Sequence, residues 1–163
     1  MSKTAYALEI VPGKQEIVGR RTFDAPRELV FKTMTEPRLI PQWWGPRSHT
    51  TKVDEMDVRP GGRWRYVHLD PDRNEHAFHG VYHDITAPER LVFTFEYEGV
   101  PGHVLLETLT LEEIDGKTRL TDQSVFQSVA DRDGMVQSGM ESGATETMDR
   151  LEELVAAARI KRA

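Results

Sequence analysis

From His49 to Phe126, apolar and polar residues alternate in short runs that turn-forming residues separate. A period of two is the repeat of a β-strand, because successive side chains point to opposite faces of a sheet. The short connections are typical of antiparallel neighbours in a meander. With a similar run near the amino terminus, the pattern predicts seven strands, over residues 16–23, 50–58, 63–69, 76–85, 90–97, 104–114 and 118–126.

The remaining segments have helical features. Asp24-Ala25-Pro26 resembles a helix start, and an apolar stripe that ends at Met34 follows it. A second short helix is expected over 37–43, because Gly45-Pro46 prevents its continuation. After Ser128, apolar residues recur at spacings of three and four, which predicts one long helix over 131–159. Two glycines interrupt this helix, and either close approach to the sheet or room for a ligand would offset their cost.

The order of elements defines an α+β class of fold. An open antiparallel sheet must bury one face, and only the carboxyl-terminal helix is long enough to cover it. We therefore predict a helix-grip fold of the START-like or Bet v-like type: a curved sheet of about seven strands around that helix, with two short helices after the first strand. Residues 1–163 are expected to form a single domain.

The alternation also predicts which side chains face the space between the sheet and the helix. Adjacent tryptophans before Gly45-Pro46 are expected at the mouth of this space, because each indole buries up to about 250 Å². In 76–85 the inward face is ambiguous, since Phe78 and Tyr82 compete with Val81 and Ile85. The predicted cavity residues are Trp43, Trp44, Trp64, Tyr66, His68, Phe93, Phe95, Glu107, Asp122 and Met140.

Three of these residues could carry chemistry. Glu107 and Asp122 fall on inward positions, where an unpaired carboxylate is costly or has a shifted pKa. They are expected either to be hydrated or paired with Arg65 or Arg119 near a strand end, or to anchor a ligand or act as a general base. His68 is either a hydrogen-bonded core histidine or a ligand contact.

Composition excludes several classes of function. The chain has no cysteine, which rules out disulfides and thiolate chemistry. Its net charge of −6 argues against nucleic-acid binding. No apolar stretch is long enough to span a membrane, and no signal-like segment is evident, so a cytoplasmic location is expected. His79 and His83 would lie about 13 Å apart on one strand face, too far to share an ion, and His76 points the other way. No metal and no cofactor is predicted.

Several sequence words occur here in one order, including Trp43-Trp44-Gly45-Pro46 and the segments 57–64, 88–94, 116–121 and 139–143. Together they resemble the activator-of-heat-shock-ninety-ATPase-like (AHSA-like) family of the START-related SRPBCC superfamily, over about residues 16–155. The resemblance implies the helix-grip fold and a deep, mostly apolar cavity. It marks no catalytic residue.

The leading functional hypothesis is therefore a binder of a small apolar ligand, such as a lipid, a polyketide or an aromatic metabolite. An enzyme of the polyketide cyclase or hydrolase type, using Glu107, Asp122 or His68, is the first alternative. A protein-interaction module is the second. A chaperone partner is less expected, because the family's co-chaperone has a further amino-terminal domain for which this chain has no room. A homodimer is also possible.

Overall fold

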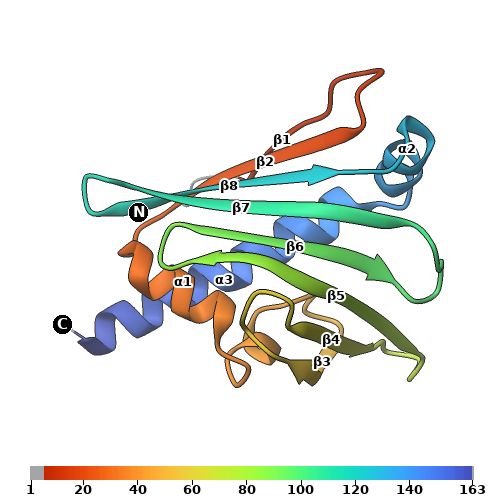
Figure 1. Cartoon of the computed structure of the whole chain (residues 1–163). Coiled ribbons are helices and arrows are strands. Elements are labelled where there is room, and N and C mark those ends of the chain that lie inside the picture. Colours follow the sequence, from red (N-terminus) through yellow and green to blue (C-terminus); the bar gives the residue numbers. More distant parts are fainter. Residues whose placement is uncertain (1–5, 163) are drawn as a thin grey trace.

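The computed structural model describes residues 6–162 of the chain. Its eight strands form one antiparallel sheet in the order β1-β2-β8-β7-β6-β5-β4-β3, and the long helix α3 crosses one face of it (Figure 1). The elements are β1 (Ala7–Glu9), β2 (Glu16–Phe23), α1 (Arg27–Thr35), the 3-10 turn η1 (Ile40–Gln42), β3 (Thr50–Met56), β4 (Arg63–Leu69), β5 (Glu75–Thr86), β6 (Arg90–Tyr97), β7 (Val104–Ile114), β8 (Lys117–Val125), α2 (Val129–Gln137) and α3 (Met140–Arg162).

All seven predicted strands are present, and the meander from β3 to β8 is confirmed. The tight turn between β7 and β8 has positive φ at Asp115 (53°) and Gly116 (76°), as an Asp-Gly hairpin requires. The prediction missed β1, a three-residue strand that pairs antiparallel with β2. So short a strand carries almost no alternation signal, and its place comes from pairing with the edge of β2.

The long carboxyl-terminal helix is confirmed as α3, but its predicted start near residue 131 was wrong. Ser138 and Gly139 separate a short helix, α2, from α3, and Gly139 has a φ of +84°. This left-handed conformation suits glycine and ends α2. The apolar spacing continues across the break, which is why periodicity alone did not reveal it. At its start, α2 is capped by the Ser128 side chain, which accepts a hydrogen bond from the Asp131 backbone N–H at 3.0 Å.

The second predicted helix, over 37–43, is only the 3-10 turn η1. The ambiguity in β5 is settled by a register shift between Tyr82 and Asp84. On the amino-terminal side of the shift, Phe78 and Tyr82 face the core, and beyond it Ile85 also packs there. The two competing patterns were therefore both partly correct, because beyond a bulge the odd-numbered and even-numbered residues exchange faces of the sheet.

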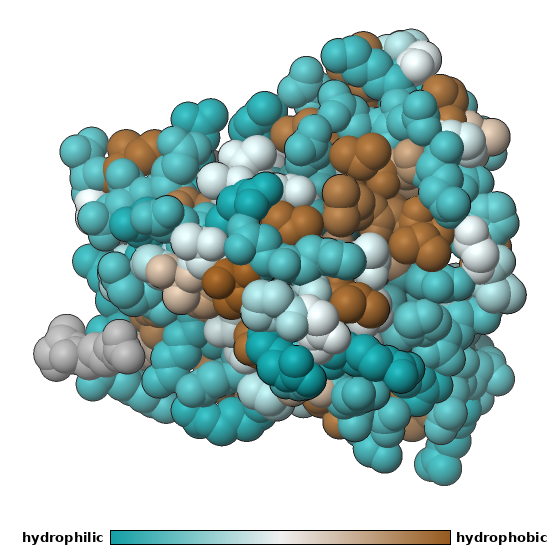
Figure 2. Space-filling model, viewed as in Figure 1, coloured by the Kyte–Doolittle hydropathy of each residue, from teal (hydrophilic) through white to brown (hydrophobic). Residues whose placement is uncertain are grey.

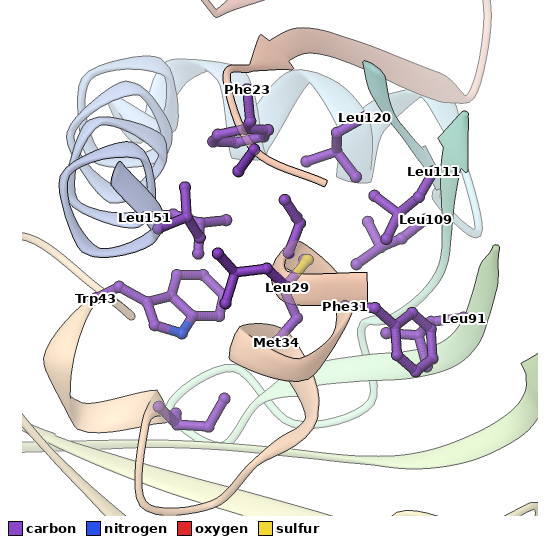
Figure 3. Close-up of a cluster of buried hydrophobic side chains, with 14 of the residues drawn as sticks. Phe23, Leu29, Phe31, Met34, Trp43, Leu91, Leu109, Leu111, Leu120 and Leu151 are labelled. Atoms are coloured by element: carbon purple, nitrogen blue, oxygen red, sulfur yellow. The ribbon is translucent and has the colours of Figure 1, made fainter. Parts of the chain in front are cut away.

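The main core lies where α1 and the carboxyl-terminal half of α3 meet the sheet. Figure 3 shows Trp43, Leu29 and Met34 converging with Leu151 of α3. Phe23 of β2 and Leu151 have no exposed surface. The segments α1 and η1 therefore fill one end of the space between the sheet and α3.

The outer face of the sheet is mostly hydrophilic in the view of Figure 2, and hydrophobic side chains gather to the right of its centre. Leu106 and Val125 are directly opposed on β7 and β8, and both are exposed. No helix in residues 6–162 has the combination of length and hydrophobicity that crossing a membrane requires.

Candidate functional site

A cavity of about 590 Å³ lies between the sheet and the amino-terminal half of α3. Its size is within the range of small-molecule sites, about 300–1,000 Å³. All ten of the predicted cavity residues line it. The other lining residues include Tyr6, Ile17, Gly19, His49, His76, Phe78, Tyr82, Leu91, Leu105, Leu109, Leu120, Ser124, Met135, Gly143, Ala144, Thr147 and Met148.

One wall of the cavity is aromatic. The Trp44 ring centroid lies 4.9 Å from that of Tyr66 and 5.3 Å from that of Phe78, both edge to face. The Trp64 centroid is 5.8 Å from that of Phe95. Strands β4, β5 and β6 supply these partners by alternation, and the loop after η1 supplies Trp44. Such contacts favour flat, apolar molecules.

The two adjacent tryptophans have different roles. Trp43 is buried in the main core, and its indole N–H donates a hydrogen bond to the Thr33 carbonyl at 3.0 Å. Trp44 belongs to the aromatic wall of the cavity instead. Its carbonyl accepts a hydrogen bond from the Thr51 hydroxyl at 2.8 Å, which fixes this loop against β3. Trp43 therefore reaches the cavity only from the core side, and Trp44 is the residue that faces its interior.

His68 stands at the Trp44 end of the cavity. Its ring centroid is 4.7 Å from that of Trp44 and 5.5 Å from that of His49. The side chain is buried, and its Nε2 has no hydrogen-bond partner within the described part of the chain. Gly45 packs closely against this ring: a Cβ added there would lie 2.4 Å from Nε2. The expectation of a hydrogen-bonded core histidine is therefore not met at this nitrogen.

The environment of His68 keeps its imidazole neutral. Burial is the main cause, and the neighbouring His49 and His76 add to it, lowering the pKa of His68 to about 4. A neutral imidazole can donate from one nitrogen and accept at the other. The His68 side chain is therefore neutral at pH 7, beside the charged Arg150, which also lowers its pKa.

The opposite end contains two carboxyl groups. Glu107 of β7 accepts a hydrogen bond from the Ser124 hydroxyl of β8 at 2.8 Å, and it is hydrogen-bonded to Asp122. Asp122 Oδ1 is buried and has no partner in residues 6–162. In the β7–β8 register, Glu107 lies opposite Ser124, and Leu109 lies opposite Asp122. The two acids are therefore diagonal neighbours on the inner face.

The two carboxyl groups titrate as a pair. Burial and the charge of Asp122 raise the pKa of Glu107 well above its ordinary value, and burial also raises the pKa of Asp122. Burial and the same two acids raise the pKa of the nearby Tyr6 hydroxyl. The pair thus holds a proton to higher pH than either acid would alone. One carboxyl group can then donate to the other.

The alternative of a partner arginine for these acids is wrong. Arg65 is bound instead by Glu98, at 2.8 Å, and by Asp54, on the outer face of the sheet. Arg119 alternates with Leu120 and is exposed. The parity of β8 places Arg119 on the face opposite to Asp122, which explains why sequence proximity was misleading.

At Gly143, the structure decides between the two explanations offered for the glycines of the terminal helix. An added Cβ at Gly143 would meet no atom within 4 Å, so close approach to the sheet does not require this glycine. The other alternative, open room beneath the helix, agrees with the position of Gly143 on the cavity wall. Met140, one turn away, also lines the cavity.

Sequence reasoning missed Tyr6, Ser124, His49 and His76 as lining residues. Ser124 shares its parity with Asp122 on β8, and that signal was present. Tyr6 depends on the unpredicted strand β1, and His49 on a loop conformation that the sequence does not specify. Within residues 6–162, no group of three or more His, Asp or Glu side chains is arranged to hold a metal ion.

The fold and cavity define a helix-grip protein, in which a curved antiparallel sheet holds a long carboxyl-terminal helix. Residues 24–156 match the family described as Activator of Hsp90 ATPase homolog 1-like protein, and the chain belongs to that family. No curated protein matches the chain.

Solved structures confirm the fold. A protein from Rhodobacter sphaeroides is similar at 25% identity with a TM-score of 0.86, over 94% of this chain and 99% of that one. A protein from Arthrobacter aurescens gives 24% identity and a TM-score of 0.86, over 93% and 91% of the two chains. The AHSA1 protein of Silicibacter pomeroyi gives 20% identity and 0.74, over 88% and 99%.

Proposed function

We propose that this protein binds a small, largely hydrophobic molecule in the cavity between the sheet and α3. The observation that carries the proposal is a cavity of about 590 Å³ with an aromatic wall at one end and a few polar groups at the other. This composition is the usual design of a small-molecule site, in which apolar surface provides affinity and a few polar groups fix orientation.

Gly143 offers a direct test. Because an added side chain there has open space in front of it, Gly143→Leu should fill part of the cavity without a clash. It also replaces glycine in a helix, which favours folding by up to about 1 kcal/mol. Gly134→Leu on α2 is the matched control, since Gly134 is exposed, has open space around it, and does not line the cavity.

The measurement is fluorescence titration with N-phenyl-1-naphthylamine, a neutral aromatic probe, alongside native mass spectrometry of the purified protein. Wild type and Gly134→Leu should bind one probe per chain, and Gly143→Leu should bind at least about tenfold more weakly. A molecule that copurifies and is displaced by the probe would name the ligand. A wild type that binds no probe, or a Gly143→Leu variant that binds as well as wild type, would contradict the proposal.

An enzyme acting in the same cavity is a second candidate, and the carboxyl pair specifically favours it. Glu107 lines the cavity, and burial and the charge of Asp122 raise its pKa. A carboxyl group with a raised pKa holds a proton that it can donate to a substrate. If a bound molecule is identified and turned over, Glu107→Gln should abolish turnover and leave binding within about threefold. Equal turnover in the variant would exclude Glu107 as the acid or base.

A further inference from the structure

The two ends of the cavity differ in their charge. The only acidic residues on the wall are Glu107 and Asp122, and none of the described residues that line it is a lysine or an arginine. At the other end of the cavity, burial and the neighbouring His49, His76 and Arg150 lower the pKa of His68 to about 4, so this imidazole is neutral at pH 7. Acidic side chains on the described wall are therefore confined to the carboxyl end.

Three arginines lie near this interior without lining the cavity. Arg21, on the inner face of β2, donates to Asp149 at 2.7 Å, and Arg132 donates to the Val11 carbonyl at 2.8 Å. Arg150 donates to the Gly45 carbonyl at 2.7 Å, beside His68. A bound anion at the carboxyl end would therefore find no counter-charge within the described wall of the cavity.

The carboxyl end has more acceptor atoms than donors, with the hydroxyls of Ser124 and Tyr6 beside the two carboxyl groups. Glu107 accepts one hydrogen bond, from Ser124, and Asp122 Oδ1 has none among the residues described. A carboxyl pair that shares one proton still has several free lone pairs. A ligand carboxylate or phosphate placed here would meet like charge and unpaired acceptors, which disfavours its binding. A hydroxyl or an ammonium group would instead supply the missing donor.

Resting on the proposed function, we infer that the ligand is a molecule with an aromatic or apolar body and one hydrogen-bond-donating hydroxyl or ammonium group, which docks at Glu107 and Asp122, and that the site discriminates against anionic ligands such as fatty acids. The body lies along the wall formed by Trp44 and Trp64. Open space beneath Gly143 of α3 gives it room.

The test compares four probes that share one ring system and differ only in their polar group: anthracene, 9-anthracenemethanol, 9-(aminomethyl)anthracene and 9-anthracenecarboxylate. Dissociation constants at pH 7 come from quenching of tryptophan fluorescence. The alcohol, the amine or both should bind at least about tenfold more tightly than the carboxylate. The probe that binds more tightly then tells which donor the site prefers.

Two variants attribute the discrimination to the carboxyl pair. In Glu107→Gln/Asp122→Asn the advantage over the carboxylate should fall below about threefold. Glu112→Gln, on an exposed position of the same strand, should keep the wild-type ratio. Circular dichroism and thermal unfolding check that both variants fold, and a series of single variants replaces the double one if it does not.

The outcomes separate the two proposals. Carboxylate binding within threefold of both donors, or a preference that survives in the double variant, overturns this inference and leaves the proposed function standing. If no probe binds, anthracene included, the proposed function fails and this inference fails with it.

Discussion

The two halves of α3 face the same sheet but meet different surroundings. In the carboxyl-terminal half, Leu151 and Val155 are fully buried against α1 and Trp43. In the amino-terminal half, from Met140 to Met148, no residue is fully buried, although the helix still lies over the sheet (Figure 1). The difference comes from the cavity, which leaves those side chains in contact with open space.

Side-chain size accounts for the difference. The packed half presents branched aliphatic residues to the side chains of α1, and the hollow half presents Gly143, Ala144 and Thr147 to the cavity. Protein interiors normally fill to the density of organic crystals, so a persistent void needs walls that cannot collapse. Here the wall is a continuous hydrogen-bonded sheet on one side and a helix supported by its packed half on the other. The carboxyl-terminal half of α3 therefore stabilises the fold, and its amino-terminal half forms a wall of the cavity.

Truncations on the two halves should separate these roles most strongly. Leu151→Ala should lower the free energy of unfolding by about 2–5 kcal/mol, because it opens a hole in a filled core. Met148→Ala, one turn earlier, should have a clearly smaller cost, since Met148 is only partly buried and borders an existing space as well as the core. Urea unfolding at pH 7 measures both, and equal costs would show that the hollow half supports the fold as much as the packed half does.

The second prediction concerns the histidine end of the cavity. The pKa of His68 is lowered from 6.5 to about 4 by burial and by neighbouring His49 and His76. Between these two pH values, the unfolded chain therefore binds a proton at this residue and the folded chain does not. This contribution to stability is present above pH 6.5 and is lost as pH falls toward 4, by up to roughly 3 kcal/mol. His68→Gln should remove that loss.

The comparison is between slopes of unfolding free energy against pH from 7 to 4.5, since absolute stabilities also include any packing change. His83→Gln, at an exposed position on β5, should keep the wild-type slope. A His68→Gln slope equal to that of wild type would mean that the imidazole is hydrated and charged in the folded protein.

The third prediction tests the boundary between the two halves. Arg21 lies on β2 between Gly19, which lines the cavity, and Phe23, which belongs to the core. It is fully buried and donates to Asp149 of α3 at 2.7 Å. Arg21→Ala should cost about 1.5–3 kcal/mol, the range for a hydrogen bond to a charged group.

Arg20→Ala is the control, because Arg20 points to the other face of β2 and pairs with Glu9 in an exposed salt bridge. It should change the unfolding free energy by no more than about 0.5 kcal/mol. If both variants cost the same, the Arg21–Asp149 contact does not hold α3 on the sheet.

Periodicity was sufficient to predict the sheet because the strands from β3 to β8 each bury one face, and burial on one face produces alternation. It gave the seven cavity residues that lie on strands for the same reason, since inward parity is all that such a list requires. It could not predict how Trp43 and Trp44 divide between core and cavity, because a loop has no period. It also could not distinguish an Asp122 with an arginine partner from one paired with Glu107, which depends on diagonal register across two strands.

The smallest expected effect is at the carboxyl end of the cavity. Burial and Asp122 raise the pKa of Glu107 well above its ordinary value of 4.5. The folded protein therefore keeps a proton that the unfolded chain releases, and stability falls as pH rises from about 4.5 through the raised pKa. This slope is opposite in sign to the contribution of His68. Glu107→Gln removes the titrating group and should flatten the decline between pH 5 and 8. The gain is modest, because Asp122 stays buried.

Glu112→Gln provides the matched control, since it removes the same charge from an exposed position of β7 and should leave the pH dependence as in wild type. Chemical unfolding of the three proteins at pH 5, 6, 7 and 8 gives the comparison. Parallel curves for wild type and Glu107→Gln would mean that water reaches the carboxyl pair freely. The cavity would then be open at this end, and a donor group on a ligand would have to compete with solvent for Glu107 and Asp122.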